Sequence, residues 1–308
     1  MAADIIGDIH GHASQLIALL KKLGYVERNG AWRHPDREVV FVGDFIDRGP
    51  EQLGTLRIVR AMIDAGAARA VMGNHEFNAI GWATPRSDGN DDHLRTRRGQ
   101  KGEKNRKQHA AFLSEVGEDS PLHREWVGWF KALPLWIDTP EFRVLHACWS
   151  DAHASDLDVS TETRPLLSKD MLPNAFSRGS PVYEALEILL KGLEIDLPAG
   201  FEFIDKDGIS RNSMRVKWWL NDTKTYREAF IGPSGVDVPD VPLRDDLSFS
   251  GPDKKTFIGH YWFDPSDGIS PASSQVACVD YSVARGGNLV AYRFDGEPEL
   301  VASNFVKV

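Results

Sequence analysis

Three short segments in the first eighty residues place potential metal ligands beside a glycine. They are GDIHG (residues 7–11), GDFIDRG (43–49) and GNHE (73–76). The side chains able to bind a metal ion are those of Asp8, His10, Asp44, Asn74 and His75. One aspartate after a glycine is typical of an ordinary turn. Three such corners in succession instead predict that these residues form one site.

The elements that precede these corners have the pattern of a parallel sheet. Buried strands are predicted at 2–6, 38–42 and 68–72, and amphipathic helices at 14–24 and 51–65. In open α/β sheets, ligands bind at the carboxyl ends of the strands. The glycines let the backbone turn sharply and approach closely there. We therefore expect the three corners to meet at one edge of the sheet.

Composition restricts the function classes. The chain has 308 residues, 42% of them hydrophobic and 26% charged, as in ordinary globular proteins. Its net charge of −9 argues against general affinity for nucleic acids or membranes. With two cysteines, no signal-peptide pattern and no apolar stretch long enough for a membrane helix, we expect a cytoplasmic protein without a membrane partner.

The rest of the chain is less regular. We interpret residues 1–308 as one domain with two insertions. Residues 82–110 are polar and irregular, and within them 93–107 carry seven Lys or Arg and one Glu after Leu94. This stretch is either a solvated loop or a mobile flap that binds phosphates or a nucleic-acid backbone. Residues 150–255 form the second, cap-like insertion, and short strands alternate with turns from Lys255 onward.

The three motifs resemble the signatures of the calcineurin-like metallophosphoesterases. The most similar branch contains the serine/threonine protein phosphatases and the bacterial bis(5'-nucleosyl)-tetraphosphatases. The resemblance is dense over the first eighty residues and later rests on His146 in LHACW and His260 in FIGHYW. Ala147 and Cys148 follow His146, where protein phosphatases usually have glycines. The resemblance implies an α/β fold: a two-sheet sandwich flanked by helices (α/β/β/α).

The resemblance also implies a site with two divalent metal ions. Carboxylate and imidazole ligands suit Mn, our first choice, with Fe or Zn as alternatives. The implied ligands are Asp8, His10 and Asp44 for the first ion, and Asp44, Asn74, His146 and His260 for the second. Asp44 would bridge the ions, and a metal-bridging hydroxide would attack the phosphorus.

Other residues are expected to handle the substrate. By resemblance, His75 protonates the leaving oxygen, and Asp47 orients its ring and keeps it protonated. Arg48 binds the phosphate with its fork of donors. Asn74 is also expected to contact substrate. We favour Arg215 in SMRVKWW as the second phosphate-binding arginine, with Arg227 as the alternative.

Three functions follow from this interpretation. The first is a hydrolase of phosphate esters or nucleoside polyphosphates, with a phosphorylated small molecule or nucleotide as substrate. The second is a protein serine/threonine phosphatase acting on phosphoproteins, and the third a nucleic-acid end-processing phosphatase or binding module. The altered LHACW motif and the cap favour the first. Six further histidines are interpreted as surface or capping residues: His12, His34, His93, His109, His123 and His153. We assign no role to Asp280.

Overall fold

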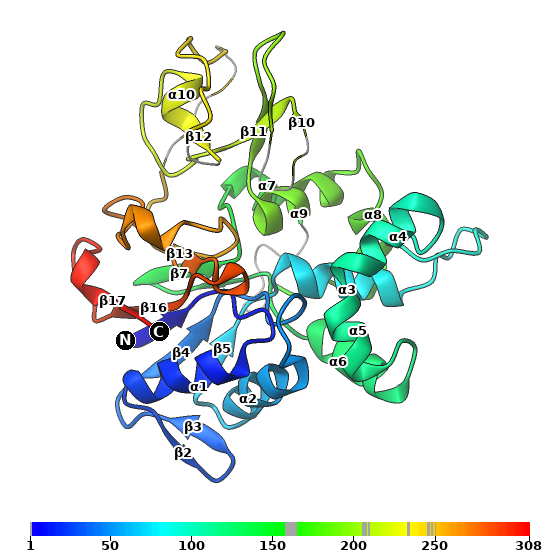
Figure 1. Ribbon diagram of the computed structural model, residues 1–308, viewed down its shortest axis with the longest axis vertical. Coiled ribbons are helices and arrows are strands. Elements are labelled where there is room, and N and C mark those ends of the chain that lie inside the picture. Colours follow the sequence, from blue (N-terminus) through cyan, green and yellow to red (C-terminus); the bar gives the residue numbers. More distant parts are fainter. Residues whose placement is uncertain are drawn as a thin grey trace.

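The computed structural model describes residues 2–157, 165–204, 208, 210–232, 235–244, 247, 249 and 251–308. Figure 1 shows a body of strands flanked by helices, with a smaller lobe around β11 and β12 at the top. In the part of the chain that is described, no helix is both long and apolar enough to cross a membrane.

The first sheet contains the three predicted strands, which are parallel to one another and adjacent in the sheet. Its order is β15 (Asp280–Tyr281), β16 (Asn288–Phe294), β1 (Ala3–Ile6), β4 (Glu38–Phe41) and β5 (Ala68–Ala70), and β17 (Phe305–Lys307) also pairs with β16. β1 pairs parallel to β4 and β4 parallel to β5, whereas β16 runs antiparallel to β1. The crossover helices are α1 (Ala13–Lys22) and α2 (Gln52–Asp64).

A second sheet packs against the first. Its order is β14 (Val276–Cys278), β13 (Lys255–Ile258), β7 (Phe142–Leu145) and β6 (Trp136–Asp138). Ile5 and Val40 of the first sheet share a buried cluster with Val144 and Phe257 of the second. Phe41, on the opposite face of β4, packs instead into the larger core that includes the helices. This alternation gives each central strand two buried faces and confirms the two-sheet sandwich.

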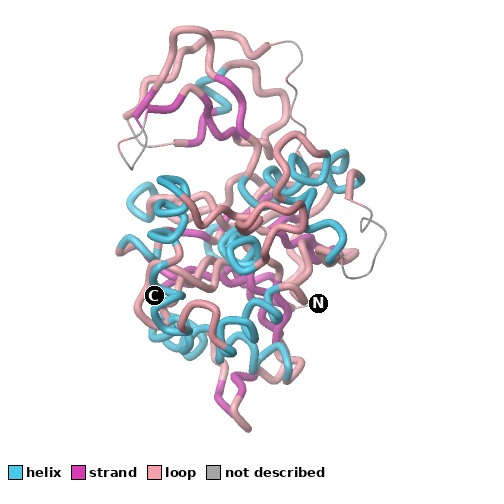
Figure 2. Tube along the Cα trace, turned by 90° about the vertical axis from the view of Figure 1, so that its right-hand side faces the viewer, coloured by secondary structure: helices cyan, strands magenta, loops and turns pink. Residues whose placement is uncertain are grey.

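Helices lie outside the sheets, as Figures 1 and 2 show. They are α3 (Asn74–Ala83), α4 (Gly99–Gln108), α5 (Ala110–Val116), α6 (Pro121–Phe130), α7 (Asp151–Ser155), α8 (Leu172–Ala175) and α9 (Pro181–Lys191). The interpretation of 82–110 as irregular is wrong for α4. This helix reads GQKGEKNRKQ and buries only Gly102 and Asn105, so it lacks the apolar period that reveals a helix.

The upper lobe is a small sheet of order β12 (Phe230–Ile231), β11 (Ser213–Val216) and β8 (Glu194–Asp196). A second pair of strands, β9 (Phe203–Ile204) and β10 (Ser210–Arg211), and the helix α10 (Tyr226–Ala229) accompany it. The single domain and its two insertions stay a prediction. The predicted cap includes residues 158–164, 205–207, 209, 233–234, 245–246, 248 and 250, which lie outside the described residues.

The remaining elements are short. β2 (Val26–Arg28) and β3 (Ala31–Arg33) form a hairpin, and 3₁₀ helices span Lys169–Met171, Pro265–Asp267, Val283–Arg285 and Ala302–Asn304. Asn29 and Gly30, between the two hairpin strands, have φ angles of 53° and 78°. Two successive positive φ angles are what a tight Asn-Gly hairpin turn requires.

Candidate metal centre

The loops at the carboxyl ends of the strands hold an unusual concentration of left-handed backbone. Positive φ occurs at the non-glycine residues His10 (46°), Asp44 (52°), Asp47 (71°), Arg48 (72°) and His260 (70°). Such conformations cost free energy for residues with a β-carbon and cluster at functional sites. The polar corners predicted from the sequence are therefore among the strained parts of this fold.

Two glycines allow two of these corners to touch. A β-carbon on Gly43 would lie 2.4 Å from the Gly73 nitrogen, and one on Gly73 would lie 2.2 Å from Asp44 Oδ1. Glu76 ties the same corners together, because its carboxylate accepts hydrogen bonds from the backbone nitrogens of Gly73 (3.0 Å), Asp44 (2.8 Å) and Phe45 (2.9 Å). Glu76 is the last residue of GNHE, and the sequence interpretation gave it no role.

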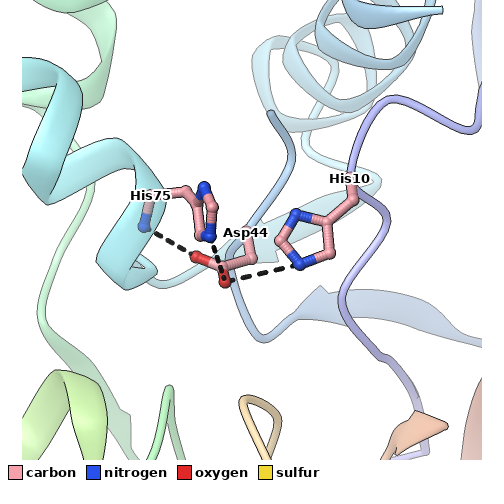
Figure 3. A group of neighbouring side chains, drawn as sticks. All are labelled: His10, Asp44 and His75. Carbon is pink, nitrogen blue, oxygen red and sulfur yellow. Dashed lines mark hydrogen bonds and ion pairs between the residues drawn. The ribbon is translucent and has the colours of Figure 1, made fainter. Parts of the chain in front are cut away.

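The first group of potential ligands contains His10, Asp44 and His75 (Figure 3). His10 Nε2 and His75 Nε2 lie 3.7 and 3.9 Å from Asp44 Oδ2. His10 Nδ1 donates to the Ile46 carbonyl at 2.9 Å, and its buried Nε2 has no hydrogen-bond partner. Burial, with His75 as the next cause, lowers the pKa of His10 to about 3. His10 is thus a neutral imidazole with a free ring nitrogen aimed at Asp44.

The second group contains Asp44, His146 and His260. His146 Nδ1 donates to the Val42 carbonyl at 2.7 Å, so its Nε2 points toward Asp44 Oδ2 at 3.4 Å. Asn74 Oδ1 lies 3.0 Å from His146 Nε2 and 2.8 Å from His260 Nδ1. Burial opposes the charge on His146, but Asp44 outweighs it and raises the pKa of that ring. The two groups share Asp44, as expected of a carboxylate that bridges two ions.

Two predicted ligands, Asp8 and Asn74, lie outside both groups; Asn74 contacts the second group as described above, and Asp8 approaches it through the backbone of His260. The Asp8 carboxylate accepts the His260 backbone N–H, with Oδ2 at 3.1 Å. Burial, followed by repulsion from Asp280 and Asp44, raises the pKa of Asp8 well above its usual value. Burial also raises the pKa of Glu76 to about 7 and that of Asp280. Several buried carboxylates in one place are costly unless cations compensate them, so the residues present fit divalent metal ions.

A buried carboxylate joins two histidines beside these groups. Asp47 Oδ2 lies 2.6 Å from His75 Nδ1, and Asp47 Oδ1 lies 2.8 Å from His109 Nδ1. Burial opposes the charge on His75, but Asp44 and Asp47 together raise its pKa. Burial also opposes the charge on Asp47, but His109 and His75 outweigh it and lower the pKa of that carboxyl. His75 is therefore held by Asp47 through Nδ1, with Nε2 toward Asp44.

His109 occupies a helix cap position, one of the two alternatives that the sequence interpretation gave, but it is not on the surface. It stands at the junction of α4 and α5 and is 4% exposed. His123 is fully buried as well, where its Nδ1 accepts the Asp119 backbone N–H. Neither residue adjoins a recognisable motif, so their position follows from how α4, α5 and α6 pack.

A pocket of about 270 Å³ opens onto these residues. Its lining includes Asp44, Asp47, Arg48, Asn74, His75, Arg95, Gln108, His109, Arg215, His260 and Trp262. The predicted phosphate-binding Arg48 and Arg215 therefore face the same space as the two ligand groups. Arg227 is not among its described lining residues; it pairs with Asp237 at 2.9 Å.

The basic stretch 93–107 is partly structural. Arg97 makes a bidentate pair with Asp119 at 2.8 and 2.9 Å, and its Nε donates to the Trp82 carbonyl at 2.8 Å. Arg98 pairs with Asp91. Of the described basic side chains in this stretch, Arg95 lines the pocket. A flap that contacts substrate stays a prediction, and Arg95 is now its best candidate.

Comparison with known proteins identifies the family. A profile of the calcineurin-like phosphoesterases matches residues 1–197. An asymmetrical bis(5'-nucleosyl)-tetraphosphatase of Geobacillus sp. (strain WCH70) is 49% identical over 76 residues, which are 24% of this chain and 31% of that protein. A symmetrical bis(5'-nucleosyl)-tetraphosphatase of Janthinobacterium sp. (strain Marseille) is 42% identical over 80 residues, 26% of each chain. These alignments thus span less than a third of the curated relatives they match.

A solved structure shares the fold. It is a protein serine/threonine phosphatase from Saccharomyces cerevisiae with similarity to human phosphatase PP5, with a TM-score of 0.50 and 14% identity over 100% of this chain and 79% of that chain. At this identity the likeness concerns the fold alone. The profile match covers more than half of the 308 residues, and its motifs are the corners described above. The chain therefore belongs to the calcineurin-like phosphoesterase family.

Proposed function

We propose that this protein is a dinuclear metal-dependent hydrolase of phosphate esters and that nucleoside polyphosphates are its natural substrates. One observation carries the proposal: two groups of potential ligands share Asp44 beside a pocket lined by Arg48 and Arg215. The names of the partial relatives, both bis(5'-nucleosyl)-tetraphosphatases, favour nucleoside polyphosphates over other phosphate esters.

The proposed ligands are those expected from the sequence. Asp8, His10 and Asp44 would hold one ion, and Asp44, Asn74, His146 and His260 the other. The free ring nitrogen of His10 and the cluster of buried carboxylates support this set. Mn, Fe and Zn all suit oxygen and imidazole donors, and we favour Mn. Two such ions supply Lewis-acid stabilisation of the phosphoryl group and an activated water at neutral pH.

The leaving group would take its proton from His75. The His75 ring is 2.6 Å from Asp47 through Nδ1, so Nε2 is the nitrogen available on the pocket side. Asp44 and Asp47 favour the protonated ring against the effect of burial. His109 holds the other oxygen of Asp47 and thereby fixes the carboxylate that orients His75. His109 is a positioning residue in this scheme.

Phosphate oxygens would be bound by two arginines. The Arg48 guanidinium lies 4.2 Å from the centre of the Trp262 ring, a cation–π contact that restricts its position. Arg215 lies on β11, with Nε 3.6 Å from Glu194, and reaches the same pocket from the upper lobe. An arginine on each side of the pocket can neutralise a phosphoryl group and orient it by paired hydrogen bonds. Asn74 would also contact the substrate.

A substrate screen tests this proposal. Protein freed of metal by chelation should be inactive and should recover activity when Mn²⁺ is restored. The panel would contain p-nitrophenyl phosphate, diadenosine tetraphosphate, a phosphoserine peptide and a 5'-phosphorylated RNA. We expect the highest kcat/KM for diadenosine tetraphosphate. Full activity without metal would contradict the proposal, and a preference for the peptide or the RNA would favour the protein phosphatase or the end-processing function instead.

A further inference from the structure

A second, larger groove continues from the metal pocket. It encloses about 1110 Å³ and shares Arg48, Arg215 and Trp262 with the smaller pocket. One wall comes from β11 and β12 in the upper lobe, and the other from the segments that follow β13 and β15, which Figure 1 shows below that lobe. The two spaces therefore meet at Arg48, Arg215 and Trp262.

Two arginines converge on the rim between the pockets. The guanidinium carbons of Arg48 and Arg285 lie 4.2 and 5.0 Å from the centre of the Trp262 ring, and that ring is 5.6 Å from the ring of His10. Desolvation lowers the pKa of Arg48; Asp44 opposes this shift, and repulsion from Arg285 adds to it. Two like charges at one ring are stabilised when an anion binds between them. The rim is therefore suited to phosphate groups next to the one held in the metal pocket.

A buried carboxylate fixes this rim. Asp280 Oδ2 accepts the Trp262 backbone N–H at 2.8 Å, and Asp280 Oδ1 accepts that of Ser282 at 3.1 Å. Trp262 and Ser282 both have left-handed backbone, with φ of 57° and 60°. Asp280 thus joins the loop after β13 to the start of the 3₁₀ helix that ends at Arg285. A rim held in this way is preorganised, which reduces the entropic cost of binding.

The rest of the groove is basic and aromatic. The basic residues among its described lining are Arg48, Arg211, Arg215, Lys217 and Arg285, and the acidic ones are Glu194, Asp264 and Asp267. This excess of basic groups contrasts with the net charge of −9 for the whole chain. Phe203, Phe230 and Phe263 also line the groove and are partly exposed. Cationic groups near the metal pocket and aromatic rings beyond them match a polyphosphate chain that ends in a nucleoside.

We propose that this groove is a second substrate subsite, in which Arg285 binds phosphates beyond the scissile one and the aromatic wall receives the distal nucleoside. The inference rests on the proposed function of the metal pocket, and it names the part of the molecule that selects nucleoside polyphosphates over short phosphate esters. Lys217, on the upper wall, is a second cation of the same subsite.

The test compares substrates of different length in the Mn²⁺-loaded full chain. The quantity compared is the ratio of kcat/KM for diadenosine tetraphosphate to kcat/KM for p-nitrophenyl phosphate. Arg285→Ala should lower this ratio about tenfold, which corresponds to about 1.4 kcal/mol. Lys217→Ala should lower the same ratio by a smaller factor. Arg33→Ala removes an equal charge from an exposed position on β3, far along the chain from the groove, and should leave the ratio unchanged. Inhibition by inorganic tripolyphosphate should weaken in Arg285→Ala as well.

Several results would overturn the inference. If the ratio is the same in Arg285→Ala and the parent, or falls equally in Arg33→Ala, the groove does not bind the distal phosphates. If Arg285→Ala impairs a phosphoserine peptide but not diadenosine tetraphosphate, the occupant is a peptide. A parent that hydrolyses p-nitrophenyl phosphate but no nucleoside polyphosphate refutes the subsite and leaves the phosphoesterase standing. A parent inactive on every substrate refutes the proposed function itself. Circular dichroism of each variant excludes misfolding as the cause.

Discussion

Replacing His75 with alanine separates two roles that the geometry allows for this residue. His75 belongs to one group of potential metal ligands, yet its ring is also held by Asp47 at 2.6 Å. If it is the proton donor, His75→Ala keeps both metal ions and loses about 10²–10⁴ in kcat for a poor leaving group, the usual contribution of a general acid. If it is a ligand, the metal content falls.

The size of the loss in kcat can be compared between Asp47→Asn and His75→Ala. The buried hydrogen bond between His75 and Asp47 is charge-assisted, and such bonds contribute about 1.5–3 kcal/mol. Asp47→Asn should therefore cost about 10–100-fold in kcat, less than the loss in His75→Ala. The order of these losses follows from the chain of contacts, because Asp47 acts only through the ring that it orients.

The assay compares leaving groups. The variants would be measured with p-nitrophenyl phosphate, whose leaving group needs little protonation, and with an alkyl phosphate, whose leaving group needs a proton. The loss in His75→Ala should be large for the alkyl ester and small for the aryl ester, with an unchanged metal content by elemental analysis. An equal loss for both esters, or the loss of one ion, would refute the assignment of His75 as the proton donor.

Three further predictions follow from named contacts. Asp44→Asn should lower both activity and metal content, because it weakens the carboxylate that both ligand groups share; full metal content in this variant would exclude a bridging role. His109→Ala should lower kcat about tenfold with little change in KM, because it leaves one oxygen of Asp47 without its hydrogen bond. His109→Gln should recover part of this loss, and a change in KM alone would contradict a positioning role. Arg97→Ala removes the ion pair with Asp119 and should lower the melting temperature by about 2–4 °C for each kcal/mol of stability lost. The KM should stay unchanged; a raised KM at constant stability would support the flap interpretation.

The corners of the first sheet could be predicted because their signals are local. Each apolar run ends in a glycine and a polar side chain, and parallel pairing of β1, β4 and β5 brings the corners to one edge. His146 carries no such local signal, and His260, although it follows Gly259 at the end of an apolar run, was also assigned by resemblance. The structure places both rings within hydrogen-bonding distance of Asn74 Oδ1.

The rest depends on tertiary packing. Helix α4 has almost no apolar residues, so nothing in its sequence indicates that it brings His109 to Asp47. Arg285 is 23 residues beyond Trp262, and the contacts that join the two segments, such as that of the Asp280 carboxylate with the Trp262 backbone, are made between residues distant in sequence. Arg97, within the basic stretch whose role the sequence left open, is held by Asp119. Contacts of this kind follow from how elements pack and have no periodic pattern in the chain.

Crystals equilibrated with Mn²⁺ would test the central claim most directly. Anomalous diffraction from the metal locates each ion independently of any activity. We predict two anomalous peaks, one between His10 and Asp44 and the other between Asp44 and His146, with the Asp44 carboxylate binding both ions. A single peak, or two peaks that do not share Asp44, would contradict the dinuclear centre proposed for this chain.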